Sequence, residues 1–228
     1  MKLAIMQPYL FPYLGYFQLI NVVDIFVIYD DLQYIKKGWI NRNYILVNGR
    51  AYLFTLSLQK ASSNKLIKNM LIHTDSKNKE KLLKVIKHAY LKAPQYKIVS
   101  PILEKVILND EENLSSYITF SLRKICDYLE IQTPFIVSPQ LLKNNALKGV
   151  DRAIELNKRL GSSCYINPIG GVKLYNKERF KKEGIELYFL KTKNIEYKQF
   201  VNVFIPFLSI IDILMFNSKD EVKKMLNE

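Results

Sequence analysis

The sequence has few cysteines and histidines, which excludes two kinds of site. Its 228 residues include two cysteines, Cys126 and Cys164, and two histidines, His73 and His88. Two cysteines are too few for a disulfide framework, and there is no Cys-x-x-Cys pair. The histidines have no metal-like spacing with a cysteine or with each other. We therefore expect a reduced, cytoplasmic protein without a metal centre.

Long hydrophobic runs are also lacking. The longest, 204–216, is interrupted by Pro206, Ser209 and Asp212, so we expect no membrane span. The first residues show no basic stretch followed by a long apolar segment, so we expect no signal peptide.

Acidic residues are fewer than basic ones. The chain has 34 Lys and Arg against 21 Asp and Glu, a net charge of +13. This excess suits an anionic partner, such as a nucleotide, a nucleotide-linked sugar, a nucleic acid or a membrane surface. The lysines are spread along the chain, however, which favours ordinary solvated lysine faces. Because no nucleic-acid motif is present, we expect no nucleic-acid partner.

Short apolar runs alternate with amphipathic segments along the chain. This alternation is typical of an α/β domain with a mostly parallel sheet and helices on both faces. The sequence predicts a single three-layer, Rossmann-like α/β domain over 1–228. Its five strands are predicted at 2–6, 24–29, 134–137, 164–167 and 186–190.

The segment 44–130 interrupts this alternation. A β-hairpin is predicted over 44–58, because an Asn-Gly pair at its centre is the two-residue signal for a type I′ turn. Leu, Ile and Met residues at three- and four-residue spacing predict helices over 60–93 and 113–129. We therefore expect an inserted hairpin and helical cap on the α/β domain.

Polar and aromatic residues gather beyond the predicted strand ends, where open parallel sheets place their ligands. Tyr and Trp faces beside amides suit a flat polar ligand, such as a base or a sugar ring, and Lys and Arg suit phosphates. Asp30, Asp31 and Asp212 are the available general bases, with capping or ion pairing as the alternative role. Asp212 lies in an apolar predicted helix, 208–216, where its carboxylate must be paired or face a polar cavity; we favour the cavity.

Two further features follow later strands. Lys148 and Arg152 lie in the first turn of a predicted helix, which suits a bound anion because that end presents free backbone donors. An ordinary solvated helix start is the alternative. Gly170 and Gly171 directly follow a strand and would let the backbone approach a ligand closely. The sequence has no Walker, zinc or hydrolase motif.

Five segments resemble the motifs of the WbqC-like protein family, and the resemblance runs essentially from end to end. They are QPYLFPYLGYFQLI, DDLQYIKKGWINRN, KGVDR, YINPIGGVKLY and LSIIDILMFN. That family is associated with gene clusters for O-antigen and other surface polysaccharides. Transfer of glycine or another acyl group onto an amino sugar has been proposed for it. The resemblance implies functional roles for Gln7, Tyr9, Tyr13, Asp31, Lys37, Trp39, Asn41, Arg42, Lys148, Arg152, Asn167, Gly170, Gly171, Tyr175 and Asp212.

The resemblance and the residues together predict a sugar N-acyl or aminoacyl transferase, or an ATP-dependent ligase. The substrate would be an amino sugar linked to dTDP, UDP or GDP, and ATP and acyl-CoA are the candidate donors. Asp31, Asp212 and Lys37 are the catalytic candidates, and a homodimer is left open. The alternative is a non-catalytic protein that binds nucleotide-linked sugars. Either way, we expect the site residues to converge on one cleft.

Overall fold

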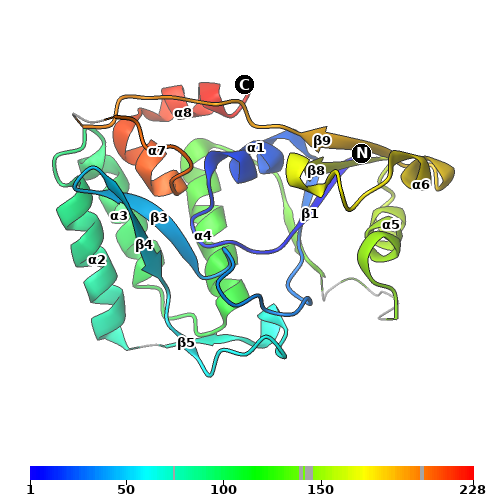
Figure 1. The fold of residues 1–228 in the computed structure, drawn as a ribbon, viewed down its shortest axis with the longest axis horizontal. Coiled ribbons are helices and arrows are strands. Elements are labelled where there is room, and N and C mark those ends of the chain that lie inside the picture. Colours follow the sequence, from blue (N-terminus) through cyan, green and yellow to red (C-terminus); the bar gives the residue numbers. More distant parts are fainter. Residues whose placement is uncertain (74, 139–140, 142–145, 201–202) are drawn as a thin grey trace.

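The five predicted strands form one parallel sheet, which confirms the α/β expectation (Figure 1). The computed structural model describes residues 1–73, 75–138, 141, 146–200 and 203–228. Each strand lies within about a residue of its expected position, because each is a short apolar run bounded by turn-forming residues. The strands are β1 (Lys2–Met6), β2 (Ile25–Ile28), β7 (Phe135–Val137), β8 (Cys164–Pro168) and β9 (Glu186–Leu190).

The strand order is β7-β2-β1-β8-β9, so the chain winds outward from β1 in both directions. This is the doubly wound arrangement in which the point of reversal, here between β1 and β8, marks the usual ligand crevice. β1 pairs with β2 along its length, from Leu3 to Met6. With β8 it pairs only at Lys2 and Leu3. The two central strands therefore pair at their amino ends and not at their carboxyl ends.

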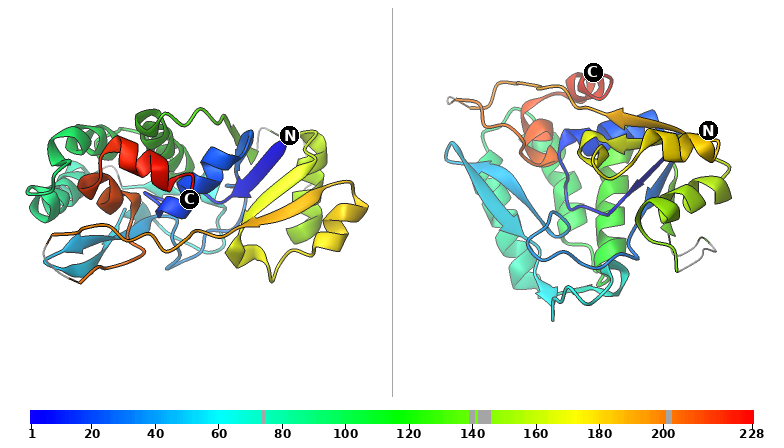
Figure 2. Two further views of the ribbon diagram at one scale, coloured as in Figure 1. Left: turned by 90° about the horizontal axis from the view of Figure 1, so that it is seen from above. Right: turned by 45° about the vertical axis from the view of Figure 1, so that its right-hand side comes forward.

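Helices cover the two faces of the sheet (Figure 2). α1 (Leu14–Val22) and α4 (Leu114–Leu129) belong to one hydrophobic core with Ala4 of β1. Leu3 and Ile5 of the same strand point to the opposite face, since side chains alternate along a strand. There they pack with Ala153, Leu156 and Phe180 in a second core, under α5 (Gly149–Arg159) and α6 (Lys177–Lys182).

The inserted segment between β2 and β7 contains the expected hairpin, β3 (Arg42–Val47) and β4 (Arg50–Thr55). Asn48 and Gly49 both have positive φ, as a type I′ turn requires. The helix predicted over 60–93 begins only at Ser76; the residues before it form short strands and a turn. The remaining elements are β5 (Leu58–Gln59), η1 (Ile67–Asn69), β6 (Leu71–Ile72), α2 (Ser76–Tyr90) and α3 (Tyr96–Ile107).

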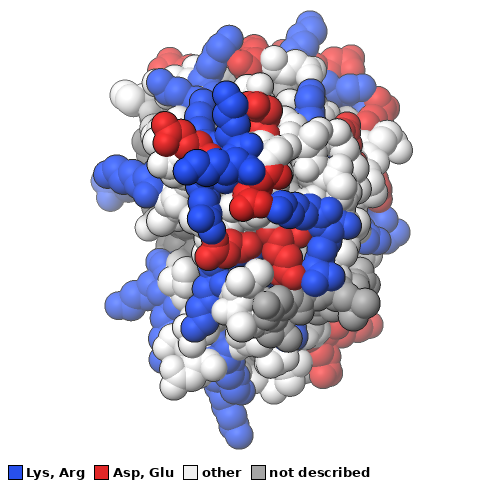
Figure 3. All heavy atoms as spheres, turned by 90° about the vertical axis from the view of Figure 1, so that its right-hand side faces the viewer, with Lys and Arg blue, Asp and Glu red and all other residues white. Residues whose placement is uncertain are grey.

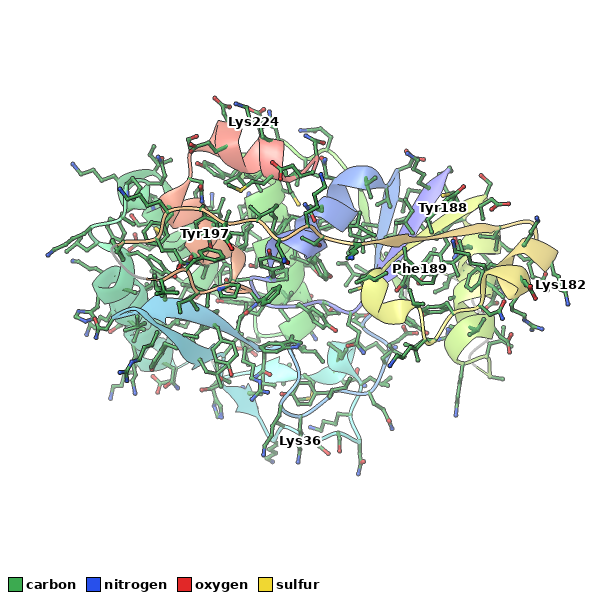
Figure 4. All side chains as sticks on the ribbon, turned by 45° about the horizontal axis from the view of Figure 1, so that its top comes forward. Lys36, Lys182, Tyr188, Phe189, Tyr197 and Lys224 are labelled. Atoms are coloured by element: carbon green, nitrogen blue, oxygen red, sulfur yellow. The ribbon has the colours of Figure 1, made fainter. Side chains whose placement is uncertain are left out.

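A buried carboxylate joins the insertion to the carboxyl-terminal part of the chain. Asp212 lies in α7 (Ile210–Phe216), fully buried. It accepts hydrogen bonds from Tyr90 Oη (2.7 Å), Tyr197 Oη (2.6 Å) and Gln199 Nε2 (2.8 Å). Figure 4 shows Tyr197 on the segment between β9 and α7, beside α7. Burial raises the pKa of Asp212, and the hydrogen bonds oppose that rise. The carboxylate is thus paired with donors in the core, and the polar cavity that we favoured from the sequence is wrong for this residue.

The chain ends in α8 (Lys219–Met225), which begins at a capping box formed by Ser218 and Glu221. Across the residues that the structure describes, none of the helices has the length and apolar character needed to cross a membrane.

Replacing Tyr197 with phenylalanine should destabilise the protein. The substitution removes one hydrogen bond to a buried carboxylate, a loss of about 1.5–3 kcal/mol. Urea denaturation followed by circular dichroism would measure it. Tyr188→Phe is the matched control, because Tyr188 is exposed on β9 (Figure 4) and should change stability by less than about 0.5 kcal/mol. Equal stability of the two variants would contradict a structural role for the Asp212 cluster.

Candidate functional site

A largely apolar cavity of about 380 Å³ lies where β1 and β8 separate. Met6 ends β1, Pro168 ends β8 and Ile169 directly follows β8, so the cavity sits outside the carboxyl ends of the two central strands. This is the crevice that a doubly wound sheet offers to ligands. We call it the aromatic cavity. The other lining residues are Tyr9, Pro12, Tyr13, Gly15, Tyr16, Trp39, Asn43, Leu190, Thr192 and Phe207.

Five aromatic side chains line the cavity. Tyr9 lies 5.8 Å from Tyr16, and Tyr13 packs edge-on against Phe207 at 5.8 Å, between ring centroids. Trp39 keeps 46% of its surface exposed. Burial raises the pKa of Tyr9, Tyr13 and Tyr16, so the phenols stay protonated at neutral pH. The wall therefore offers flat apolar faces with hydroxyl groups at their edges, which suits a ring with polar substituents.

The loop that carries the tyrosines is held in place from two other parts of the chain. Phe11 has a positive φ of 43°, which is costly for a residue with a side chain. Its carbonyl oxygen accepts hydrogen bonds from Asn43 Nδ2 and Ser209 Oγ, both at 2.8 Å. The loop also contains two prolines, Pro8 and Pro12, which fix its backbone. These restraints set the positions of Tyr9 and Tyr13.

Gly15 lets α1 approach the segment that follows β9. A Cβ atom at this position would come within 2.3 Å of Thr192 Oγ1. Gly15 and Thr192 both line the cavity. The absence of a side chain at Gly15 therefore allows α1 and the segment after β9 to pack together in this wall of the cavity.

A second group of predicted site residues forms a buried ion pair near the ends of β2 and β7. Arg152 Nη2 contacts Asp31 Oδ2 at 2.9 Å, and their side chains are only 7% and 6% exposed. Ser138 Oγ donates to Asp31 Oδ1 at 2.8 Å. Burial raises the pKa of the neighbouring Tyr29 to about 12, although the Arg152 charge opposes the rise. The guanidinium predicted to bind an anion is thus already matched by a carboxylate.

A third group lies in the second half of β8 and just after it. Asn167 Nδ2 donates to Tyr165 Oη at 2.6 Å, and the Tyr165 ring packs edge-on against Tyr175. A Cβ atom on Gly171 would come within 2.1 Å of Asn167 Oδ1, whereas one on Gly170 would meet nothing within 4 Å. The glycine pair thus has two different roles: Gly171 makes room for Asn167, and Gly170 presents open backbone at the surface.

The structure brings only part of the predicted site together. Of the predicted residues, Tyr9, Tyr13 and Trp39 line the aromatic cavity, and Gln7 lies beside them, its Oε1 3.5 Å from Tyr9 Oη. The two arginines and Asp212 do not line it. Arg42 is adjacent, its Cζ 5.9 Å from the Trp39 ring. The cleft therefore includes only a few of the residues that we expected to converge on it.

The remaining predicted residues have other environments. Asn41 is buried, accepting from Tyr34 Oη and donating to the Leu56 carbonyl, both at 2.7 Å. Lys37 is exposed with a φ of 61°, and its carbonyl oxygen accepts a hydrogen bond from Arg42. Lys148 immediately precedes α5 and makes no side-chain cap. Sequence reasoning missed Asn43, Thr192 and Phe207, because nothing in their local pattern indicates which strand end they approach.

Several charged residues on the α5–α6 face form ion pairs. Figure 3 shows Lys and Arg interleaved with Asp and Glu over this face. Arg179 contacts Asp151 at 2.7 Å, and Lys158 contacts Glu183. This face is therefore not the unbroken basic stripe that nucleic-acid binding requires. Within the described ranges, no three His, Cys, Asp or Glu side chains are grouped in a way that could hold a metal ion.

Comparison with known proteins gives a family and one uncharacterised relative. The model of the WbqC-like protein family matches residues 7–224. A Mycobacterium tuberculosis protein with the name "Uncharacterized protein Rv1507c" is 29% identical over 216 residues, covering 93% of this chain and 92% of the relative. No solved structure matches the chain.

Alanine substitutions in the glycine pair should separate the two roles. Gly171→Ala forces a shift of Asn167 and should cost about 1–3 kcal/mol of stability. Gly170→Ala has open space and should change stability by less than about 0.5 kcal/mol. Thermal or urea unfolding of the two variants beside the parent protein would measure the difference. A Gly170 variant as unstable as the Gly171 variant would contradict this assignment.

Proposed function

The chain belongs to the WbqC-like protein family, and on that premise we propose that it acts on a nucleotide-linked amino sugar. The reaction that we propose is transfer of an acyl or aminoacyl group, such as glycyl, onto the sugar amine. The biological setting would be the synthesis of O-antigen or another surface polysaccharide, as the sequence resemblance implies.

The aromatic cavity is the observation that supports this proposal. Its volume of about 380 Å³ is at the lower end for small-molecule sites and suits one ring system. Tyr9, Tyr13 and Trp39 provide faces for a sugar or a base. Arg42, whose Cζ lies 5.9 Å from the Trp39 ring, and Lys37, which is exposed two residues before Trp39, are the cations that we propose to contact phosphates.

In the proposed reaction the sugar amine attacks an activated carboxyl carbon. A C–N bond forms, the bond to the leaving group breaks, and the amine proton passes to a base. Asp31 is the candidate base nearer the ligand-binding edge of the sheet, three residues beyond β2. To accept the proton, its carboxylate would have to exchange its contacts with Arg152 and Ser138 for the sugar amine. Asp212 is enclosed by three donors in the core. With ATP and glycine, ATP would first convert the glycine carboxylate into an acyl phosphate or acyl adenylate, and the sugar amine would then displace phosphate or AMP. With acyl-CoA, the thioester bond would break and the CoA thiolate would leave.

One observation favours the alternative of a non-catalytic sugar-nucleotide-binding protein. No Asp, Glu, Lys, Arg or His is among the described residues that line the aromatic cavity. Such a lining can hold a ring but supplies no general base of its own. The two functions share the binding step and differ in turnover.

Binding can be followed through Trp39, the only tryptophan of the chain. Because its half-exposed ring lies on the cavity wall, titration with UDP-, dTDP- or GDP-linked amino sugars should shift its fluorescence. Tyr13→Ala should weaken binding about 10-fold or more, as the loss of a stacked ring does. Tyr188→Ala, outside the cavity, is the control. An unchanged spectrum with every sugar nucleotide would contradict the proposed site.

Transfer itself should appear as a mass increase of the sugar nucleotide. The full-length protein would be incubated with each amino sugar nucleotide and with ATP and glycine, or with acyl-CoA. A product heavier by one acyl or glycyl group, formed by the parent protein and lost with Asp31→Asn, supports the transferase. Fluorescence-detected binding without any mass change would instead support the non-catalytic alternative.

A further inference from the structure

A second cavity, of about 490 Å³, lies near the carboxyl ends of β2 and β7. Asp30, just beyond β2, and Val137, at the end of β7, form part of its wall, together with the first turns of α4. It shares no described lining residue with the aromatic cavity. Its wall is polar, with the hydroxyl groups of Ser115, Ser116 and Thr119. We call it the polar cavity.

One carboxylate oxygen in this wall has no hydrogen-bond donor. Asp30 is only 3% exposed. Its Oδ2 accepts a hydrogen bond from Ser115 Oγ at 2.5 Å, whereas Oδ1 has no partner among the described residues. Burial raises the pKa of Asp30, and the Ser115 hydrogen bond opposes this rise. An unsatisfied buried carboxylate oxygen is costly, so it marks a place where a ligand can supply the missing donor.

The other charged residues of the wall restrict the chemistry of that ligand. Glu111 is a second carboxylate, with one oxygen already accepting a hydrogen bond from the Asn113 backbone N–H at 2.9 Å. Two carboxylates favour a ligand group that is positively charged and carries N–H donors. Arg123 also lines the cavity and is exposed. Its planar guanidinium suits a carboxylate or phosphate.

We propose that the polar cavity is a second binding site, for a small ligand with a primary ammonium group at one end and an anionic group at the other. The ammonium pairs with the Asp30 carboxylate, and the anionic group faces Arg123. Hydroxyl groups on the ligand can bond with those of the first turns of α4. This site does not depend on sugar-nucleotide binding in the aromatic cavity and would stand if that binding failed.

The test uses pairs of probes that differ in the ammonium group alone. One pair is glucosamine 6-phosphate and glucose 6-phosphate; the smaller pair is O-phosphoethanolamine and 2-hydroxyethyl phosphate. Isothermal titration calorimetry with the full chain at neutral pH should show, in at least one pair, the amine binding about 10-fold or more tightly. A charge-assisted hydrogen bond to a buried carboxylate produces a preference of this size.

Asp30→Asn should abolish the preference for the amine, because the side chain keeps its size and loses its charge. Asp110→Asn is the matched control: it removes the same charge from an exposed residue one position before Glu111 that does not line the cavity. It should leave the preference unchanged. Arg123→Gln should weaken both members of a pair about equally.

A second variant covers the case in which Asp30→Asn fails to fold. Ser116 is exposed in the first turn of α4, and its side chain makes no hydrogen bond with any described residue. Replacing it therefore removes no hydrogen bond from the cavity wall. Ser116→Trp should fill the cavity mouth and abolish binding, with unfolding unchanged. Trp39→Ala should leave amine binding intact. Failure of the parent protein to prefer the amine in either pair would overturn the proposal, as would binding that survives Ser116→Trp or is lost with Trp39→Ala.

Discussion

The separation of β1 from β8 is the constraint on which the candidate site depends. The two strands pair through Lys2 and Leu3 and no further, whereas β1 follows β2 for four residues and β8 follows β9 for five. Each central strand is thus held by its outer neighbour. The connections on either side of this point run over opposite faces of the sheet, which leaves a crevice at the carboxyl ends of the two strands. Aromatic side chains line it.

Those side chains come from parts of the chain that are far apart in sequence, and buried polar groups hold the parts together. Asn43 and Ser209 both bond to the carbonyl group of Phe11. Asp212 bonds to tyrosines from α2 and from the segment after β9. Both of these buried acceptors, the Phe11 carbonyl group and the Asp212 carboxylate, have their donors. The polar interior of the protein is therefore what positions an apolar surface pocket.

The sequence predicted the fold well and the site in part, for physical reasons. The short apolar runs predict the strands, and one Asn-Gly pair predicts the hairpin, because these signals depend only on neighbouring residues. Residues before Ser76 have helical spacing, yet Gln33 bridges to Leu66 and Leu71 to Asn113, so tertiary pairing overrides the local pattern. The position of Asp212 allowed either pairing or a polar cavity. Only the three-dimensional placement of Tyr90 and Tyr197 shows the paired state. Phe207 and Thr192 line the cavity because of packing between distant parts of the chain, which the spacing of residues in the sequence does not show.

The amino-terminal residue is tied into the middle of the sheet. The Met1 carbonyl accepts hydrogen bonds from the backbone of Ser163 and Cys164, and its ammonium group donates to Ser163 Oγ, 162 residues away. β1 is thus completed by a strand about 160 residues further along the chain. Contacts of such long range carry a large loop-closure entropy and slow the folding of parallel sheets. During translation, β1 must therefore wait for about 160 further residues before its second neighbour exists.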